Sequence, residues 1–360
     1  MTGLLAAFFT SFLITLVVIR YQHLHSHLSA DSDLSGPQKF HKVSVPRIGG
    51  IGIALGLFCA ILFRLQSAPG SILEMTLLLC AIPTFAIGLT EDLTKKIGVK
   101  TRLIFTAISA LAFVILLNAQ ITHLDIPGID YLFQLPAIAI LFTIFSITGL
   151  ANAYNIIDGF NGLSSMVGII TLLALGYISF VVVDPTMMYL SFVMAAAILG
   201  FFIWNYPLGL IFLGDGGAYL IGFWIASISV LLVARHENIS PWFALMINAY
   251  PILETIFTIY RRKIHQGKSP GQPDGIHFHS LIYRRILNTN STQNKADLFS
   301  ANARTAPYLW ILTTMAVVPA ILWWNSSYLL MFATLVFVIS YVWLYKKIVC
   351  FQTPKWMHPY

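Results

Sequence analysis

Residues 216–234 read GGAYLIGFWIASISVLLVA, a stretch without a charged side chain. A helix needs about 20 predominantly apolar residues to cross the hydrocarbon of a bilayer, where it satisfies its own backbone hydrogen bonds. The stretch therefore predicts a transmembrane helix. Further runs share this character, which predicts eleven transmembrane helices: 2–19, 47–66, 72–90, 102–119, 132–150, 163–183, 187–204, 216–234, 241–260, 306–324 and 327–345.

The composition of the whole chain agrees with this prediction. Of the 360 residues, 58% are hydrophobic and 10% are charged, whereas a soluble domain carries about 25% charged residues. Such a composition excludes a soluble domain, a disordered chain, collagen and a disulfide-rich secreted scaffold. The three cysteines show no CxxC spacing, so neither a zinc site nor a disulfide framework is predicted. We expect an all-α polytopic integral membrane protein with one continuous domain over residues 1–360.

The basic residues predict the orientation of the chain. No Lys or Arg precedes the first run and Arg20 follows it, which places the N-terminus outside and the C-terminus in the cytoplasm. All but two of the 21 Lys and Arg residues, Arg64 and Arg235, then lie in or beside cytoplasmic connections, as the positive-inside rule requires. These connections are residues 20–46, 91–101, 151–162, 205–215, 261–305 and the tail after 345. Because the opposite loops are short, we expect any chemistry on the cytoplasmic side.

The acidic residues are few and unevenly placed. Four of the 14, namely Glu91, Asp92, Asp158 and Asp215, fall where predicted spans meet the cytoplasm, and Glu254 lies within a span. The adjacent carboxylates of Glu91 and Asp92 repel each other and are stable together when a cation or a basic group is close. A solvated helix end with the following lysines as partners is the alternative explanation.

A second polar motif follows the fifth predicted span. Residues 152–163 read NAYNIIDGFNGL, and the three-residue spacing of Asn152, Asn155 and Asp158 puts them on one broad face of a helix. Two amides and a carboxylate are costly at a membrane edge, which indicates a functional site. A hydrogen-bonded contact between helices is the alternative.

A third motif opens the span at 216–234. Residues 212–218 read FLGDGGA, so Asp215 is flanked by glycines at the start of a helix. This arrangement exposes a carboxylate to a metal ion and turns the helix N–H groups toward an anion. A simple N-cap aspartate is the alternative.

The last motif is a basic loop with two alternating histidines. Residues 261–285 read RRKIHQGKSPGQPDGIHFHSLIYRR and include Arg261, Arg262, His277 and His279. Guanidinium and ammonium groups in one loop are suited to binding phosphates, although contact with anionic lipid is an alternative. The two histidines lack Cys or further His partners, which disfavours a zinc site.

Taken in order, these motifs resemble those of the polyprenyl-phosphate N-acetylhexosamine-1-phosphate transferases of glycosyltransferase family 4, especially the bacterial undecaprenyl-phosphate GlcNAc-1-phosphate transferase-like branch. The matching pieces run from about residue 37 to residue 285: GPQKFHKVSVPRIGG, the acidic pair at 91–92, NAYNIIDGFNGL, FLGDGG and RRK…GKSP…PDGIHFHSLI.

The resemblance implies that a HexNAc-1-phosphate, such as GlcNAc-1-phosphate, passes from a UDP-sugar to undecaprenyl phosphate with release of UMP. This reaction would start a lipid-linked cell-envelope glycan, such as that of lipopolysaccharide O-antigen or of the cell wall. The resemblance further implies Mg²⁺ or Mn²⁺ as cofactor and a multi-pass protein of the bacterial inner membrane. The active site would face the cytoplasm, and the family includes homodimers.

Motif position also implies roles for single residues. Asp215 would be the metal ligand. Asp92, with Glu91 beside it, would be the base that deprotonates the lipid phosphate or, in a two-step reaction, a covalent nucleophile. Asp158 would join these catalytic acids and, with Asn152 and Asn155, hold nucleotide, sugar or metal-bound water. The remaining residues would bind the substrates: Lys39 and His41 near the lipid phosphate, and Arg261 or Arg262 with His277 and His279 at the donor diphosphate and sugar.

Two positions depart from the family pattern. Glu91 stands where the family usually has aspartate, and Ser280 stands at the last position of an HxHH motif. The second departure favours the hexosamine-phosphate branch over a phospho-MurNAc-pentapeptide transferase, which stays an alternative. A secondary transporter or flippase without chemistry is a further alternative, disfavoured because the acids gather at the inner edge. The net charge of +7 arises from the cytoplasmic loops and indicates no nucleic-acid partner.

Overall fold

The computed structural model describes residues 1–29, 45–67, 72–265, 267, 275–287, 295–354 and 357 of the chain. Most of these residues are helical. The helices are α1 (Thr2–Arg20), α2 (Gln22–Ser29), α3 (Gly50–Ser67), α4 (Ile72–Thr94), α5 (Val99–Leu117), α6 (Asp130–Phe133), α7 (Pro136–Ile156), α8 (Leu163–Val181), α9 (Pro185–Asn205), α10 (Gly214–Arg235), α11 (Pro241–Ile247), α12 (Ala249–Tyr260), the π-helical turn η1 (Arg261–His265), α13 (Phe278–Ile282), η2 (Tyr283–Leu287), α14 (Lys295–Leu322) and α15 (Ser327–Val349).

The prediction of an all-helical chain with many membrane spans is confirmed in its coarse form. Within the described ranges, nine helices are long and apolar enough to cross a membrane: α1, α4, α5, α7, α8, α9, α10, α14 and α15. The pair α11 and α12 adds a tenth if it forms one broken span, and the apolar part of α3 is shorter. Every one of the eleven predicted runs coincides with helix, while their number as membrane spans stays a prediction.

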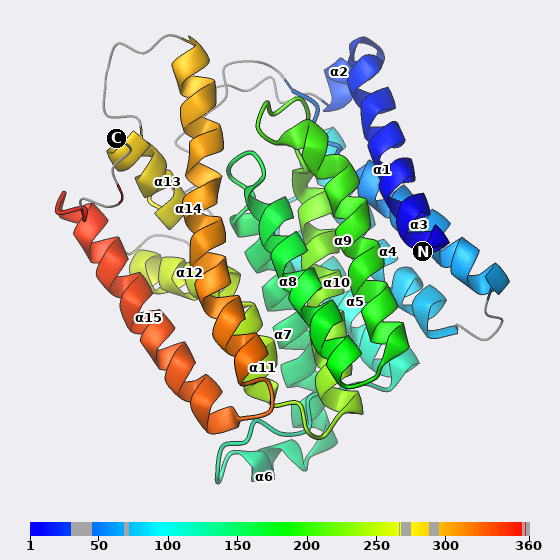
Figure 1. The fold of residues 1–360 in the computed structure, drawn as a ribbon, viewed down its shortest axis with the longest axis vertical. Helices are drawn as coiled ribbons and strands as arrows, with labels where there is room; N and C mark the ends of the chain where they lie inside the picture. The colour runs from blue at the N-terminus through cyan, green and yellow to red at the C-terminus, as the bar shows by residue number, and fades with distance from the viewer. Residues whose placement is uncertain are drawn as a thin grey trace.

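Helix α10 occupies the centre of the bundle and packs against α3, α4, α7, α8 and α9 (Figure 1). Close packing depends on glycines where neighbouring backbones approach. A Cβ atom on Gly222 would lie 2.7 Å from the Cα atom of Ala151 in α7. A Cβ atom on Gly88 of α4 would likewise lie 2.7 Å from the backbone nitrogen of Gly216. These contacts hold α4 and α7 against α10, and the site forms where they meet.

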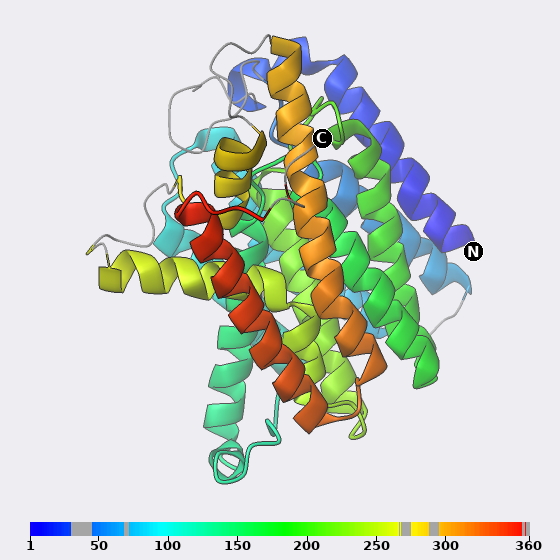
Figure 2. The same cartoon turned by 60° about the vertical axis from the view of Figure 1, so that its left-hand side comes forward.

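The predicted run at 241–260 is not one straight helix, because α11 and α12 meet at an angle of 76°. Proline has no N–H group and its ring clashes with the carbonyl four residues earlier. For Pro251 that carbonyl belongs to Ile247, the last residue of α11. The side chain of Asn248 donates a 3.0 Å hydrogen bond to the carbonyl of Ala244 and helps to end α11. Helix α12 therefore crosses the bundle at a steep angle to α7 and α15 (Figure 2).

Helices α4 and α7 end, and α10 begins, at the end of the bundle drawn uppermost in Figure 1. We call this the site end. It also carries α2, α13 and the first turns of α14, whereas α6 lies at the opposite end.

Part of the loop predicted at 261–305 is helical, since α14 begins at Lys295 and α13 and η2 precede it. Apolar periodicity does not reveal the first turns of α14, because polar side chains make part of its buried face. The carbonyl oxygen of the Asn302 side chain accepts a 3.1 Å hydrogen bond from the backbone N–H of Asn161. This bond fastens α14 to the loop that follows α7.

Candidate functional site

The site is built around the start of α10, and the residues directly before this helix pair with a segment far away in the sequence. The backbone N–H of Phe212 donates to the carbonyl of Pro46 at 2.8 Å. In return, the N–H groups of Gly49 and Gly50 donate to the carbonyls of Phe212 and Leu213, both at 3.0 Å. This pairing fixes the backbone on either side of residue 47 beside the start of α10.

Asp92 from the end of α4 caps the start of α10. Its Oδ1 atom accepts a hydrogen bond of 2.8 Å from the N–H of Asp215, and its Oδ2 atom accepts one of 2.9 Å from Gly216. Both N–H groups belong to the first turn of α10, where no carbonyl of the same helix can reach them. The Asp92 residue is 2% exposed, and its carboxyl group lies in the positive field of the helix start.

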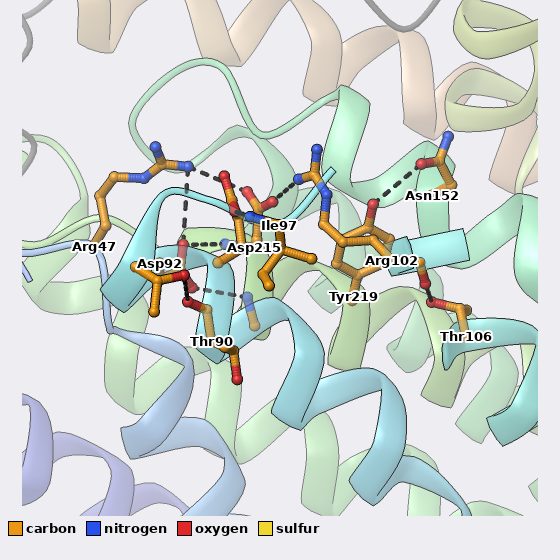
Figure 3. Close-up of polar contacts among 12 residues, drawn as sticks. Arg47, Thr90, Asp92, Ile97, Arg102, Thr106, Asn152, Asp215 and Tyr219 are labelled. Atoms are coloured by element: carbon orange, nitrogen blue, oxygen red, sulfur yellow. Dashed lines mark hydrogen bonds and ion pairs between the residues drawn. The ribbon is translucent and has the colours of Figure 1, made fainter. Parts of the chain in front are cut away.

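Asp215 lies between two arginines from different parts of the chain (Figure 3). Arg47 Nη2 donates to its Oδ1 atom at 3.2 Å, and Arg102 Nη1 from the first turns of α5 donates to its Oδ2 atom. Arg47 also lies 3.9 Å from Asp92 Oδ1. The Asp215 residue is 5% exposed, whereas the Arg47 side chain is 31% exposed and lies at the rim. Two carboxylates and two guanidinium groups thus form one compact cluster.

Gly214 makes this geometry feasible. Its φ of +76° is rarely adopted by other residues, and a Cβ atom there would lie 2.6 Å from Asp92 Oδ2 and clash with the carbonyl of Arg47. We expect Gly214→Ala to destabilise the protein by about 3 kcal/mol, because backbone strain and overpacking add. Thermal unfolding of the purified protein in detergent measures this loss.

Gly98 provides a matched control at the start of α5. Its φ is −69°, and an added Cβ atom would meet no other atom within 4 Å. Gly98→Ala should therefore leave the unfolding temperature close to that of the parent protein. Equal unfolding temperatures for the two variants would contradict the constraint at Gly214.

Glu91 points elsewhere than its neighbour. Its Oε2 atom accepts a 2.6 Å hydrogen bond from the backbone N–H of Ile97, in the turn between α4 and α5. The two acids of the predicted pair therefore have different partners. Asp92 caps α10, and Glu91 secures the turn that leads to Arg102.

The amide motif at the end of α7 lies beside the cluster. The Oδ1 atom of Asn152 accepts a 3.2 Å hydrogen bond from the hydroxyl of Tyr219, which is fully buried in α10 (Figure 3). Asn155 is half-buried near the end of α7. Asp158 follows the helix and interacts electrostatically with both Arg47 and Asp92. Burial raises the pKa of Asp158 to about 7, although the charge of Arg47 lowers it.

The histidine motif packs against the amide motif. A Cβ atom on Gly159 would lie 2.9 Å from Nε2 of His279, so the ring of His279 rests on this glycine. The ring of His277 stacks on that of His279 with a centroid distance of 5.1 Å and an interplanar angle of 14°. Motifs more than 100 residues apart in the sequence thus lie together at the site end.

The remaining predicted substrate-binding residues divide into two groups. Arg261 and Arg262 form the beginning of η1, directly after α12, and both are buried. Lys39 and His41 lie outside the described residues.

The oxygen ligands at Asp215 are compatible with Mg²⁺. Among the described residues, no three His, Cys, Asp or Glu side chains are grouped as a complete metal site. Mg²⁺ needs no such group, because it commonly binds one or two carboxylates and takes its other ligands from water and substrate phosphates. In the structure both oxygens of the Asp215 carboxylate contact an arginine, so a cation would replace at least one of these partners. The oxygen chemistry of Asp215 fits Mg²⁺, and a substrate phosphate would then take over the displaced guanidinium group.

The site includes residues that were not predicted for it, namely Arg47, Arg102 and Tyr219. Both arginines are visible in the sequence as basic residues at the edges of apolar runs. Their meeting at Asp215 depends on how α3, α5 and α10 pack, which spacing does not reveal. No feature of the sequence marked Tyr219 as a site residue, apart from its position one helical turn after Asp215.

Comparison with known proteins agrees with this arrangement. The family model described as glycosyl transferase family 4 matches residues 74–233, which include the acidic pair, the amide motif and Asp215. The undecaprenyl-phosphate alpha-N-acetylglucosaminyl 1-phosphate transferase of Yersinia pestis is 30% identical over 256 residues, covering 69% of this chain and 68% of the relative.

The alignments with two further relatives cover a larger share of each relative. The protein of the same name from Thermotoga maritima is 27% identical over 254 residues, which are 71% of this chain and 73% of the relative. A probable undecaprenyl-phosphate N-acetylglucosaminyl 1-phosphate transferase of Bacillus subtilis is 27% identical over 285 residues, which are 78% of each chain.

Proposed function

Because the chain belongs to glycosyl transferase family 4 and is a transferase, we propose that it transfers a HexNAc-1-phosphate from a UDP-sugar to undecaprenyl phosphate and releases UMP. GlcNAc-1-phosphate is the first candidate for the transferred group, because the relatives named above carry it in their names. The product would start a lipid-linked glycan of the cell envelope.

The observation that carries this proposal is the convergence of Arg47 and Arg102 on Asp215 at the start of α10. Phosphoryl transfer between two anionic substrates depends mainly on positioning and on neutralising charge. Two guanidinium groups supply donors for phosphate oxygens, and the carboxylate between them can hold a cation. The alternative of a transporter or flippase without chemistry is set aside, because the matching family is described as glycosyl transferases and the relatives are named as transferases.

The residues of the cluster and of the neighbouring motifs would have different roles in the reaction. Asp215 would hold Mg²⁺ or Mn²⁺, which when bound would neutralise charge developing on the diphosphate. Asp92 holds the first turn of α10, and thus the Asp215 backbone, and is the candidate base for the lipid phosphate. Asp158, Asn152 and Asn155 would orient nucleotide and sugar from the end of α7. The other groups would bind phosphates: Arg261, Arg262, His277 and His279 at the donor, and Lys39 and His41 at the lipid.

The proposal includes the setting of the enzyme. The protein would lie in the bacterial inner membrane with the site end facing the cytoplasm, where UDP-sugars are available. The distribution of Lys and Arg supports this orientation, with the N-terminus outside and the C-terminus inside.

UMP release by the purified protein tests the proposal. With UDP-N-acetylglucosamine, undecaprenyl phosphate and Mg²⁺, we expect release that requires the lipid. Removing the divalent cation with EDTA should lower the rate by on the order of 10³-fold, because several kcal/mol of charge stabilisation is lost. Adding Mg²⁺ or Mn²⁺ back should restore it.

Other outcomes of the same assay are informative. UMP release only with a modified UDP-N-acetylhexosamine would replace GlcNAc as the proposed sugar and support the same reaction. Release only with UDP-MurNAc-pentapeptide would move the chain to the peptidoglycan branch. Silence with all these donors, from protein that is folded in detergent, would reject the proposed reaction.

A further inference from the structure

A buried carboxylate beside the histidine motif has no part in the roles given so far. Glu254 lies in α12 after the bend and is 1% exposed. Its Oε1 atom accepts a 3.1 Å hydrogen bond from the backbone N–H of Phe278, and its Oε2 atom accepts one of 2.8 Å from the hydroxyl of Tyr341 in α15. The carboxylate therefore ties α12, α13 and α15 together beside the histidine motif.

The third partner of this carboxylate is His277. The Nδ1 atom of His277 lies 3.1 Å from Glu254 Oε1 and 3.2 Å from the hydroxyl oxygen of Thr258. A carboxylate oxygen and an unprotonated ring nitrogen would repel each other at this distance, because both are acceptors. The contact therefore requires the proton of His277 on Nδ1, and it directs Nε2 away from Glu254.

We propose that Glu254 is the positioning residue of His277: its carboxylate fixes the ring and its Nδ1 proton, so that Nε2 is presented to the donor substrate. The inference rests on the proposed function, in which His277 contacts the donor diphosphate or sugar. The stack on His279, which rests on Gly159, holds the same ring from its face. A carboxylate behind a histidine commonly sets the tautomer and basicity of the ring in this way.

A double-mutant cycle separates positioning from a merely structural role. Glu254→Gln keeps the size of the side chain and an acceptor oxygen but removes the charge. We expect it to lower kcat/KM for the UDP-sugar by about tenfold, as for other residues that orient a functional histidine, and to leave KM for the lipid within about twofold. In a His277→Gln background, Glu254→Gln should have no further effect on transfer.

Tyr341→Phe is the matched control. It removes one hydrogen bond from the same carboxylate and leaves the contact with His277 in place, so kcat/KM for the donor should fall less than about threefold. An equal loss from Glu254→Gln in both backgrounds would overturn the inference, and so would a parallel loss for donor and lipid.

A spectroscopic readout tests the inference independently of activity. In the full-length protein labelled with [15N]histidine, the signals that disappear in His277→Gln report the protonation of both ring nitrogens. We expect a protonated Nδ1 in the parent protein and a larger Nε2–H tautomer fraction in Glu254→Gln. An Nε2–H tautomer in the parent protein would overturn the inference. Absence of UMP release with the expected tautomer would reject the proposed function alone.

Discussion

Asp215→Asn should lower kcat/KM for transfer by on the order of 10³-fold, because a neutral amide cannot hold Mg²⁺ against the competing charge of two arginines. Arg47 and Arg102 both donate to this carboxylate, so the substitution leaves two guanidinium groups facing an uncharged side chain. UMP release measures the activity. Binding of Mn²⁺, followed by electron paramagnetic resonance in the presence of UDP-sugar, measures the metal site directly.

Asp184→Asn is the control for losing a buried carboxylate. Asp184 lies at the start of α9, at the opposite end of the bundle, where Arg235 donates to it at 2.8 Å and His236 lies 3.1 Å away. Its removal should lower the unfolding temperature while the folded fraction keeps its Mn²⁺ binding and its turnover. Retained transfer and Mn²⁺ binding in Asp215→Asn would contradict the metal assignment.

Asp92→Asn should lower kcat/KM for transfer about as much as Asp215→Asn does. It should also weaken the packing of α4 on α10. The amide of asparagine offers one acceptor oxygen, whereas the Asp92 carboxylate accepts from both Asp215 and Gly216. One N–H group of the first turn would face an NH₂ donor, which costs about 1–3 kcal/mol when buried. Transfer kinetics and thermal unfolding of the same preparation separate the chemical loss from the structural one.

Glu91→Gln provides the comparison for Asp92. The glutamine retains an oxygen that can accept from Ile97, so the turn between α4 and α5 should persist and transfer should fall by about tenfold or less. A larger loss in Glu91→Gln than in Asp92→Asn would reverse the roles of the two acids.

The long apolar helices could be predicted from sequence because apolar length is a local property. Helices α8, α9 and α10 each coincide with a predicted run to within a few residues at either end. The bend at Asn248 was not predicted, although Pro251 was visible, because membrane helices tolerate proline when neighbours satisfy the freed carbonyl. The first turns of α14 were missed because their buried side chains, such as Asn302, are polar.

Those site residues could be predicted whose placement at a membrane edge is energetically costly, because such a cost indicates a function. Asp92, Asp158 and Asp215 stood out because carboxylates at a membrane edge need a reason, and the described structure brings all three to one end. That Asp92 caps the helix carrying Asp215 could not be predicted, since this contact joins residues 123 positions apart. Glu254 was noted as an acid within a span, but its partner His277 depends on the bend before α12.

The enclosure of α10 affects how its sequence can change over time. Of its most apolar stretch, 94% lies inside the protein, compared with 28% for α15. The lipid-facing surface of α15 needs only to remain apolar, so Leu, Ile, Val and Phe can replace one another there. Around α10 the neighbours are other helices at close-packed density, so an added methylene forces neighbouring side chains or backbone to shift. Side-chain volume, more than hydrophobicity, should therefore restrict substitution in the central helix of this enzyme.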